Sequence, residues 1–258
     1  MAAGSGSLLR PLLGRLAVNA LAVEVSPAAR TQLSEHVAVA EQIPDMIRGV
    51  VIANELLDNL PMALAQRVDG AWRERWVGAD DVELTFVDAK PRQEVIDWLD
   101  AYAGPVDDGG WVEVQLEARR WVKDVVGRIS AGALLAIDYG DTAENLLGRR
   151  QDGTLRTYRA HHLGPHPLDE PGETDITADV NFTALLDVSP DATLHRQDDF
   201  LVGLGLRKRL SDIRKEELEA ARSGDEMERL RLRTTGTEIE TLLHPRGLGD
   251  FRVLEIPV

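Results

Sequence analysis

The fold of this chain can be worked out from residues 49–61, which run Gly49-Val50-Val51-Ile52-Ala53-Asn54-Glu55-Leu56-Leu57-Asp58-Asn59-Leu60-Pro61. The apolar run predicts a strand buried on both faces, as in a parallel sheet covered by helices. An amide and two carboxylates follow the strand at once. In open α/β sheets, ligands bind just beyond the carboxyl ends of the strands. We therefore expect a binding site for a charged ligand at this strand tip.

The composition excludes several classes of protein. The 258 residues carry a net charge of −15, which argues against binding to nucleic acid or to an anionic membrane surface. The chain has no cysteine, so disulfides, cysteine-ligated zinc and thiol nucleophiles are excluded. Its apolar runs are too short to cross a bilayer, and residues 1–6 lack the pattern of a signal peptide. We expect a bacterial cytoplasmic protein with no membrane insertion; its oligomeric state is not set by the sequence.

Strand and helix patterns alternate along the chain and predict a single α/β domain over residues 1–258. Residues 62–90 predict an antiparallel insertion, with a hairpin turn at Asp69-Gly70 and no core of its own. A second buried strand ends in Asp138-Tyr139-Gly140. A charged helical region is expected at 198–243, broken near Ser223-Gly224. The other expected elements are strands at 21–25, 37–40, 192–195 and 251–256, helices at 8–16, 27–34, 91–102, 112–129 and 179–186, and mostly loop at 141–180.

Asn54, Glu55 and Asp58 are the strongest candidate site residues. Two carboxylates near one strand end can hold a guanidinium or ammonium group, and a carboxylate offers the bidentate geometry that arginine prefers. Bringing the acids together raises the pKa of one of them, and a bound cation relieves this repulsion. The alternative is that Asn54 or Asp58 caps a helix. Asp138 repeats the pattern on a second strand, where a functional and a structural role are both open.

The N-terminal region carries a possible nucleotide site. Gly4 and Gly6 precede a predicted helix, where glycines allow a ligand to approach backbone N–H groups. Glu24 ends a strand and can accept both hydroxyls of a ribose, and Ser26 follows it. The alternatives are a flexible N-terminal stretch and an acid that caps the next helix.

Three histidines, His161, His162 and His166, lie in a loop rich in glycine, proline and acids. Their spacing matches no compact ligand pattern, so we expect no metal site. A histidine that positions substrate or acts as a general base fits better. Asp175 and Thr177 are expected to cap the helix that follows.

Taken in order, these strings resemble the MidA-like S-adenosylmethionine-dependent methyltransferases, whose mitochondrial members are complex I assembly factors. No single string is decisive, but the ordered set covers nearly the whole chain. The strings are Gly-Ser-Gly (4–6), Val-Glu-Val-Ser-Pro (23–27), residues 53–61, Ile-Asp-Tyr-Gly (137–140), Gly-Thr-Leu-Arg-Thr-Tyr-Arg-Ala-His (153–161), residues 171–182, Gln-Asp-Asp-Phe-Leu (197–201) and residues 247–254.

The resemblance implies a class I, Rossmann-like methyltransferase fold: a mostly parallel sheet with flanking helices, an antiparallel last strand and an incomplete first strand. It implies S-adenosylmethionine as cofactor, with Gly4 and Gly6 under its methionine part and Glu24 at its ribose hydroxyls. Ser26 and Asn54 are also expected to bind the cofactor. Asn54, Glu55 and Asp58 would face the methyl-transfer centre. The implied acceptor is a protein side chain, in particular arginine, and Glu55, Asp58 or His161 would accept its proton.

Members of this family carry a longer segment before the point where this sequence starts, with a Gly-Asp-Phe stretch and an acid-x-Gly motif. Weak or absent binding of S-adenosylmethionine by the chain as given is therefore expected. The competing hypothesis is a non-catalytic assembly or binding protein that keeps the substrate-facing loops. A dehydrogenase that uses NAD is disfavoured, because no complete G-x-G-x-x-G occurs.

Overall fold

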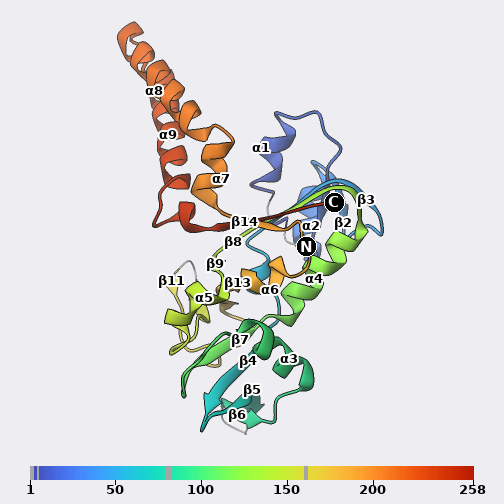
Figure 1. Ribbon diagram of the computed structural model, residues 1–258. Coiled ribbons are helices and arrows are strands. Elements are labelled where there is room, and N and C mark those ends of the chain that lie inside the picture. The colour runs from blue at the N-terminus through green and yellow to red at the C-terminus, as the bar shows by residue number, and fades with distance from the viewer. Residues whose placement is uncertain (1–2, 5, 80–82, 160–161) are drawn as a thin grey trace.

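The computed structural model describes residues 3–4, 6–79, 83–159 and 162–258, and a mixed sheet lies at its centre (Figure 1). The strand order is β14 (Thr193–Arg196), β15 (Arg252–Pro257), β8 (Ile129–Asp138) and β3 (Ile47–Asn54). β3 runs parallel to β8, whereas β15 runs antiparallel to both β8 and β14. The antiparallel last strand is confirmed. The expectation of a mostly parallel sheet is not, because two of these three pairings are antiparallel.

The expectation that β3 is buried on both faces was wrong. Ala53 is buried, but Val50 is 60% exposed and Ile52 is 47% exposed. β3 is the edge strand of this sheet among the described residues, and only one of its faces is covered. Apolar residues alone predicted a strand correctly, but they could not tell an edge strand from a central one.

The main core lies between the sheet and two helices, α4 (Leu116–Arg128) and α6 (Phe182–Leu186). α4 buries Ala118, Trp121, Val122 and Val125, whose spacing places them on one helix face. The sequence predicted a helix from residue 112. The chain instead forms β7 (Trp111–Val114) first, and the helix begins at Leu116.

A close approach of two glycines fixes the pairing of β3 with β8. Gly132 lies opposite Gly49 and has a φ of +144°. A Cβ added to Gly132 would lie 1.8 Å from the carbonyl oxygen of Gly49, so only glycine fits. The resulting register sets Asn54 opposite Ile137 and brings the two strand tips together.

A second, antiparallel sheet has the order β6 (Leu84–Ala89), β5 (Ala71–Ala79), β4 (Ala63–Val68) and β7. Asp69 and Gly70 both have positive φ, as a two-residue hairpin turn requires. Among the described residues of 62–90, only Ala65 joins a buried hydrophobic cluster, in agreement with the expectation that this region has no core of its own. The rest of that cluster comes from later elements, and α3 (Gln93–Tyr102) supplies Val95, Trp98 and Leu99.

The N-terminal part forms a small unit of its own. It contains α1 (Leu9–Leu13), β1 (Leu21–Val23), α2 (Pro27–Ser34) and β2 (Ala38–Ala40). β1 and β2 pair in parallel as a two-stranded sheet separate from the central one. Ser26 caps α2 by accepting a hydrogen bond from the N–H of Ala29, as the Ser-Pro signal predicts.

Residues 141–159 and 162–180 are more ordered than the sequence suggested. They include β9 (Gly140–Asp141), α5 (Ala143–Leu146), the 3-10 turn η2 (Leu147–Arg149), β10 (Arg156–Arg159), β11 (His162–Leu163), β12 (Asp175–Thr177) and the start of β13 (Val180–Asn181). β10 pairs with both β11 and β12. This small sheet lies beside the tips of β3 and β8 because β12 contacts η1 (Leu57–Asn59).

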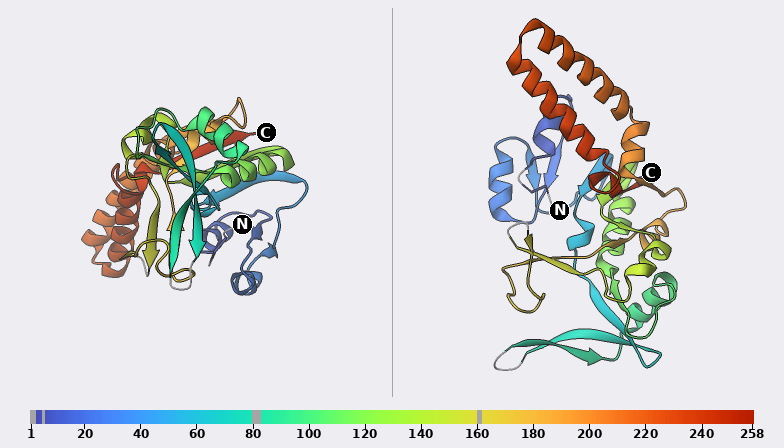
Figure 2. Two further views of the ribbon diagram at one scale, coloured as in Figure 1. Left: turned by 90° about the horizontal axis from the view of Figure 1, so that it is seen from below. Right: turned by 90° about the vertical axis from the view of Figure 1, so that its left-hand side faces the viewer.

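The charged C-terminal region is helical, as predicted. It contains α7 (Gln197–Gly203), α8 (Leu206–Ser223) and α9 (Glu226–Leu242), and the break falls at Gly224, with a φ of +80°. α8 and α9 form a hairpin that projects from the molecule at the end opposite the antiparallel sheet (Figures 1 and 2). None of the helices in the described ranges has the length and apolar character needed to cross a bilayer.

Leu254 tests the main core because its side chain is fully buried on β15. Leu254→Ala should lower the free energy of unfolding by roughly 2–5 kcal/mol, through lost transfer energy and a residual cavity. Leu218→Ala, at an exposed position of α8, should change it by less than about 0.5 kcal/mol. Urea denaturation measures both, and equal losses would contradict this placement of the core.

Candidate functional site

A cleft of about 1030 Å³ opens at the carboxyl ends of β3 and β8. The lining residues come from four parts of the chain: the segment after β3, the tip of β8, the segment 149–179, and the loop before β15. They are Glu55, Leu56, Asp58, Asn59, Tyr139, Gly140, Arg149, Arg156, Tyr158, Asp175, Thr177, Asp179, Arg246, Gly247, Asp250 and Phe251. A polar cleft at this edge of the sheet is where the sequence predicted a ligand.

Asp138 joins the two strand tips. One of its carboxylate oxygens accepts hydrogen bonds from the backbone N–H groups of Leu57 (2.9 Å) and Asp58 (3.3 Å). The other oxygen accepts the N–H of Tyr139 at 3.0 Å. The Asp138 side chain has no solvent exposure. Its carboxylate therefore holds the segment after β3 in place and is not free to bind a ligand.

Asp58 lies at the floor of the cleft and is only 2% exposed. Its carboxylate accepts hydrogen bonds from the hydroxyl of Tyr139 and from the side-chain amide of Asn59. The Tyr139 hydroxyl also contacts the hydroxyl of Thr177 on β12. Asp58 forms no ion pair with any residue in the part of the chain that the structure describes. A buried carboxylate without a cation is unusual, and it favours a positively charged ligand.

Burial and mutual repulsion raise the pKa values of this group of residues. Burial raises the pKa of Asp58. Burial and then the charge of Asp58 raise the pKa of Asp138 to about 8. The pKa of Tyr139 is also raised, first by burial and then by its hydrogen bond to Asp58, so it stays a neutral donor. The expected pair of interacting acids exists, but its members are Asp58 and Asp138 instead of Glu55 and Asp58.

Glu55 enters the cleft from a strained backbone. It has a φ of +49°, which is uncommon for a residue other than glycine, and its N–H donates to the carbonyl of Ile137 at 2.9 Å. Its exposed carboxylate accepts a hydrogen bond from the side-chain amide of Asn54. Asn54, Glu55 and Asp58 are therefore neighbours here, but only Asp58 is buried.

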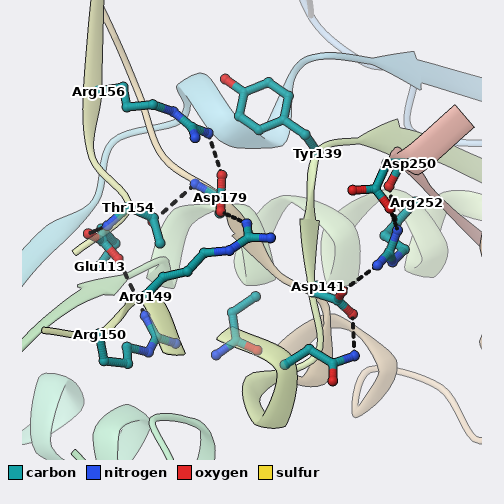
Figure 3. A network of polar contacts seen from close by, with 12 residues as sticks. Glu113, Tyr139, Asp141, Arg149, Arg150, Thr154, Arg156, Asp179, Asp250 and Arg252 are labelled. Atoms are coloured by element: carbon teal, nitrogen blue, oxygen red, sulfur yellow. Dashed lines mark hydrogen bonds and ion pairs between the residues drawn. The ribbon is translucent and has the colours of Figure 1, made fainter. Parts of the chain in front are cut away.

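Asp179 and two arginines also line the cleft, and Figure 3 shows their contacts. The Asp179 carboxylate is buried and pairs with both Arg149 and Arg156. The Arg156 guanidinium also stacks over the Tyr139 ring, 5.4 Å from its centroid. Sequence reasoning missed these three residues, although Arg156 lies within the string 153–161 that carried the family resemblance.

Two helix-capping expectations were wrong. Asp175 and Thr177 belong to β12, where Thr177 pairs with Arg156, and both residues line the cleft. Asn181 caps α6 instead, by accepting the N–H of Thr183 at 3.2 Å. Polar residues before a helix often act as caps, so the sequence alone favours that role. The pairing of β12 with β10 shows that Asp175 and Thr177 belong to a strand instead.

Four of the candidate cofactor residues, Gly4, Gly6, Glu24 and Ser26, lie in the N-terminal unit, whereas Asn54 ends β3. Glu24 is 5% exposed, and its two carboxylate oxygens accept the N–H groups of Gly4 (3.0 Å) and Ser26 (2.9 Å). Gly6 has a φ of +76°, and a Cβ there would lie 2.8 Å from the side chain of Leu33. A carboxylate and neighbouring backbone N–H groups are the kinds of polar group that can hydrogen-bond to a nucleoside. Both of its oxygens are engaged within the protein.

The structure describes two of the three candidate histidines. His161 lies outside the described residues. His162 is exposed on β11, and His166 contacts the ring of Phe86, 5.7 Å away. Within the described ranges, no three His, Asp or Glu side chains converge as a set that could hold a metal ion.

Sequence comparison connects the chain to a known family. Residues 2–198 match the model of a family described as "Putative S-adenosyl-L-methionine-dependent methyltransferase". The chain belongs to this family. Similar proteins include the mitochondrial protein arginine methyltransferase NDUFAF7 homologs of Drosophila melanogaster (30% identical over 206 residues) and Caenorhabditis elegans (32% over 179). These matches cover 72% and 66% of this chain but only 45% and 40% of the relatives, so the chain corresponds to less than half of their length.

Solved structures support the same assignment. The α/β fold is similar to that of a Burkholderia thailandensis protein bound to S-adenosyl-homocysteine, with a TM-score of 0.82 and 25% identity. That match covers the whole of this chain and 70% of the other. A second Burkholderia thailandensis structure gives a TM-score of 0.85, also at 25% identity, over 72% of its length.

The raised pKa of Asp138 predicts a pH dependence of stability. Its folded-state pKa of about 8 lies above the ordinary 3.8, so the stabilisation present below pH 4 is lost as the pH rises through 8. The loss should be on the order of a few kcal/mol in urea denaturation between these limits. Asp58→Asn should lower the pKa of Asp138, since it removes the neighbouring charge. Carboxyl ¹³C titration measures this, and an Asp138 midpoint near 4 in the wild type would contradict the geometry.

Proposed function

We propose that this chain is part of an S-adenosylmethionine-dependent methyltransferase that acts on the guanidinium group of a protein arginine. The observation that carries the proposal is Asp58, a buried carboxylate without a cation on the floor of an acidic cleft. Glu55 supplies a second carboxylate at the same strand tip. A guanidinium group matches both in charge and in hydrogen-bonding geometry.

In this mechanism Asp58 has two tasks. Its carboxylate holds the guanidinium in place through hydrogen bonds, and positioning of this kind supplies much of the acceleration. The bound cation also lowers the pKa of Asp58 and keeps it ionised. When bound, S-adenosylmethionine supplies an electrophilic methyl group. As the new N–C bond forms and the S–C bond breaks, one nitrogen proton passes to Asp58, which acts as general base.

Tyr139 and Thr177 orient the carboxylate of Asp58. The Tyr139 hydroxyl donates to one oxygen of the Asp58 carboxylate and fixes its orientation, and Thr177 fixes the hydroxyl. Arg156 stacks on the ring of Tyr139 and holds it in place. Glu55 stabilises positive charge on the acceptor.

On the donor side we propose that Gly4, Gly6, Glu24 and Ser26, with Asn54, hold the cofactor. Gly4 is exposed and donates its N–H to Glu24. A ribose hydroxyl that replaced this N–H would keep the carboxylate satisfied. The relatives named above are protein arginine methyltransferases, which supports arginine as the acceptor. The link to respiratory complex I that the family resemblance implies is part of the same proposal.

A non-catalytic binding protein is the second candidate. Two observations favour it: both oxygens of Glu24 are engaged by backbone N–H groups, and Val50 and Ile52 expose an apolar strand. Such a protein would bind an arginine-containing segment in the cleft without transferring a methyl group.

Asp58→Asn tests the role of Asp58 as the general base. It should reduce methyl transfer to an arginine peptide by roughly 10²–10⁴-fold, because the general base is lost, and it should leave cofactor affinity unchanged. Asp100→Asn, at an exposed position of α3, is the matched control. Transfer is measured with methyl-labelled cofactor and mass spectrometry. Unchanged transfer in Asp58→Asn would remove Asp58 from the mechanism; peptide binding without transfer by the wild type would favour the second candidate.

Glu24→Gln tests the donor side. Replacing the charged acceptor should weaken the binding of S-adenosyl-homocysteine by roughly 10- to 100-fold, because a hydrogen bond to a charged group is worth about 1.5–3 kcal/mol. Calorimetric titration measures this affinity. Glu35→Gln, at the exposed end of α2, should bind as the wild type does. Equal affinity of all three proteins would exclude Glu24 from the cofactor site.

A further inference from the structure

The loop between α9 and β15 is rigidly built. The carbonyl of His244 accepts hydrogen bonds from the N–H groups of Gly247 (3.0 Å) and Gly249 (3.1 Å). A Cβ at Gly249 would lie 2.7 Å from that same carbonyl oxygen, so the turn needs glycine there. The loop ends in the 3-10 turn η3 (Leu248–Asp250), which leads into β15.

Ion pairs anchor this loop to the central sheet. Arg196 on β14 donates to the carbonyl of Pro245 at 3.0 Å and pairs with Asp250. Arg252 on β15 pairs with both Asp250 and Asp141 (Figure 3). The guanidinium groups of Arg196 and Arg252 are thus paired with carboxylates of the protein.

Arg246 lies on the same loop and differs from these cations. It lines the cleft and is exposed. Its guanidinium forms no hydrogen bond or ion pair with the residues that the structure describes. The other two arginines of the cleft, Arg149 and Arg156, are both paired with Asp179. Arg246 is therefore the cleft's unpaired cation within the described part of the chain.

The unpaired carboxylates of the cleft come from other segments. Glu55 and Asp58 follow β3, and Asp175 lies on β12; in the described ranges none of the three has an ion-pair partner. The cleft thus presents several unpaired acids together with one unpaired guanidinium. Its charges are complementary to a ligand that carries a cation and, at a separate point, an anion.

We propose that Arg246 selects substrates in which an acidic residue lies near the target arginine. This inference rests on the proposed function, because it assumes that the acids receive the target guanidinium. The hydrogen-bonded loop fixes the backbone of Arg246 at the cleft wall, and a peptide carboxylate can pair bidentately with its guanidinium. Charge complementarity of this kind sets specificity more than total affinity.

The test uses fluorescence anisotropy with three labelled peptides that share one arginine and differ in the flanking residues: Glu, Gln or Lys. The wild type should bind the Glu peptide about fivefold more tightly than the Gln peptide, as a solvent-accessible ion pair allows. Arg246→Gln should remove this preference, and Arg246→Glu should reverse it in favour of the Lys peptide. Arg222→Gln, at an exposed position of α8, should keep the wild-type preference.

Persistence of the Glu preference in Arg246→Gln, or its absence in the wild type, would overturn the proposal. A carboxylate could also come from the amino-acid part of the cofactor, so S-adenosyl-homocysteine affinity is measured in the same variants. A loss of that affinity in Arg246→Gln with no change in peptide preference would assign Arg246 to the cofactor and overturn the inference. A charge-dependent peptide preference without any methyl transfer would confirm the role of Arg246 and contradict the proposed function.

Discussion

The buried carboxylate of Asp138 is the interaction on which the site depends. It ends β8, and it accepts the backbone N–H groups of Leu57 and Asp58, which lie about 80 residues earlier in the chain. Three backbone hydrogen bonds offset part of the cost of burying this group, and the remainder raises its pKa. Without this carboxylate, the turn after β3 would lose two of the hydrogen bonds that fix its position relative to the sheet. The Asp138 side chain holds Leu57 and the buried Asp58 at the tip of β8, and the N–H of the strained Glu55 donates to Ile137 on the same strand.

Charge balance within the cleft follows from that constraint. Asp179 forms ion pairs with two arginines, whereas the described partners of the Asp58 carboxylate are neutral hydrogen-bond donors. An acid that is buried among neutral donors keeps a raised pKa until a cation arrives. In the proposed function, this difference lets the cleft distinguish a permanently charged guanidinium from a neutral side chain of similar shape. The same balance leaves Arg246 available to an anionic group on the ligand.

Local patterns predicted the parts of this structure that depend on neighbouring residues. The Asp69-Gly70 hairpin, the Ser26 cap of α2 and the helix break at Gly224 each follow from the conformational preference of one or two residues. Asp58 was found because a carboxylate after an apolar strand is unusual. The helix predicted from residue 112 failed because sheet pairing of Val112 and Val114 with β4 outweighs helix periodicity.

Long-range pairing could not be predicted in this way. Asp138 and Asp58 interact only through the register of β3 with β8, and Arg156 reaches Asp179 only through the pairing of β10 with β12. The exposure of Val50 depends on which strands lie beside it, and an apolar sequence carries no information on that. The ordered set of family strings identified the family, but it could not show which acids interact.

The central claim is that the Asp58 site recognises a guanidinium cation, and a titration of Asp58 tests it most directly. Carboxyl ¹³C shifts of Asp58 would be followed against pH, first alone and then with a saturating arginine peptide or its citrulline counterpart, which is neutral and nearly the same shape. The account predicts that the arginine peptide lowers the pKa of Asp58 and that the citrulline peptide does not, since only a cation favours the ionised carboxylate. An equal effect of both peptides, or no change with arginine, would contradict it.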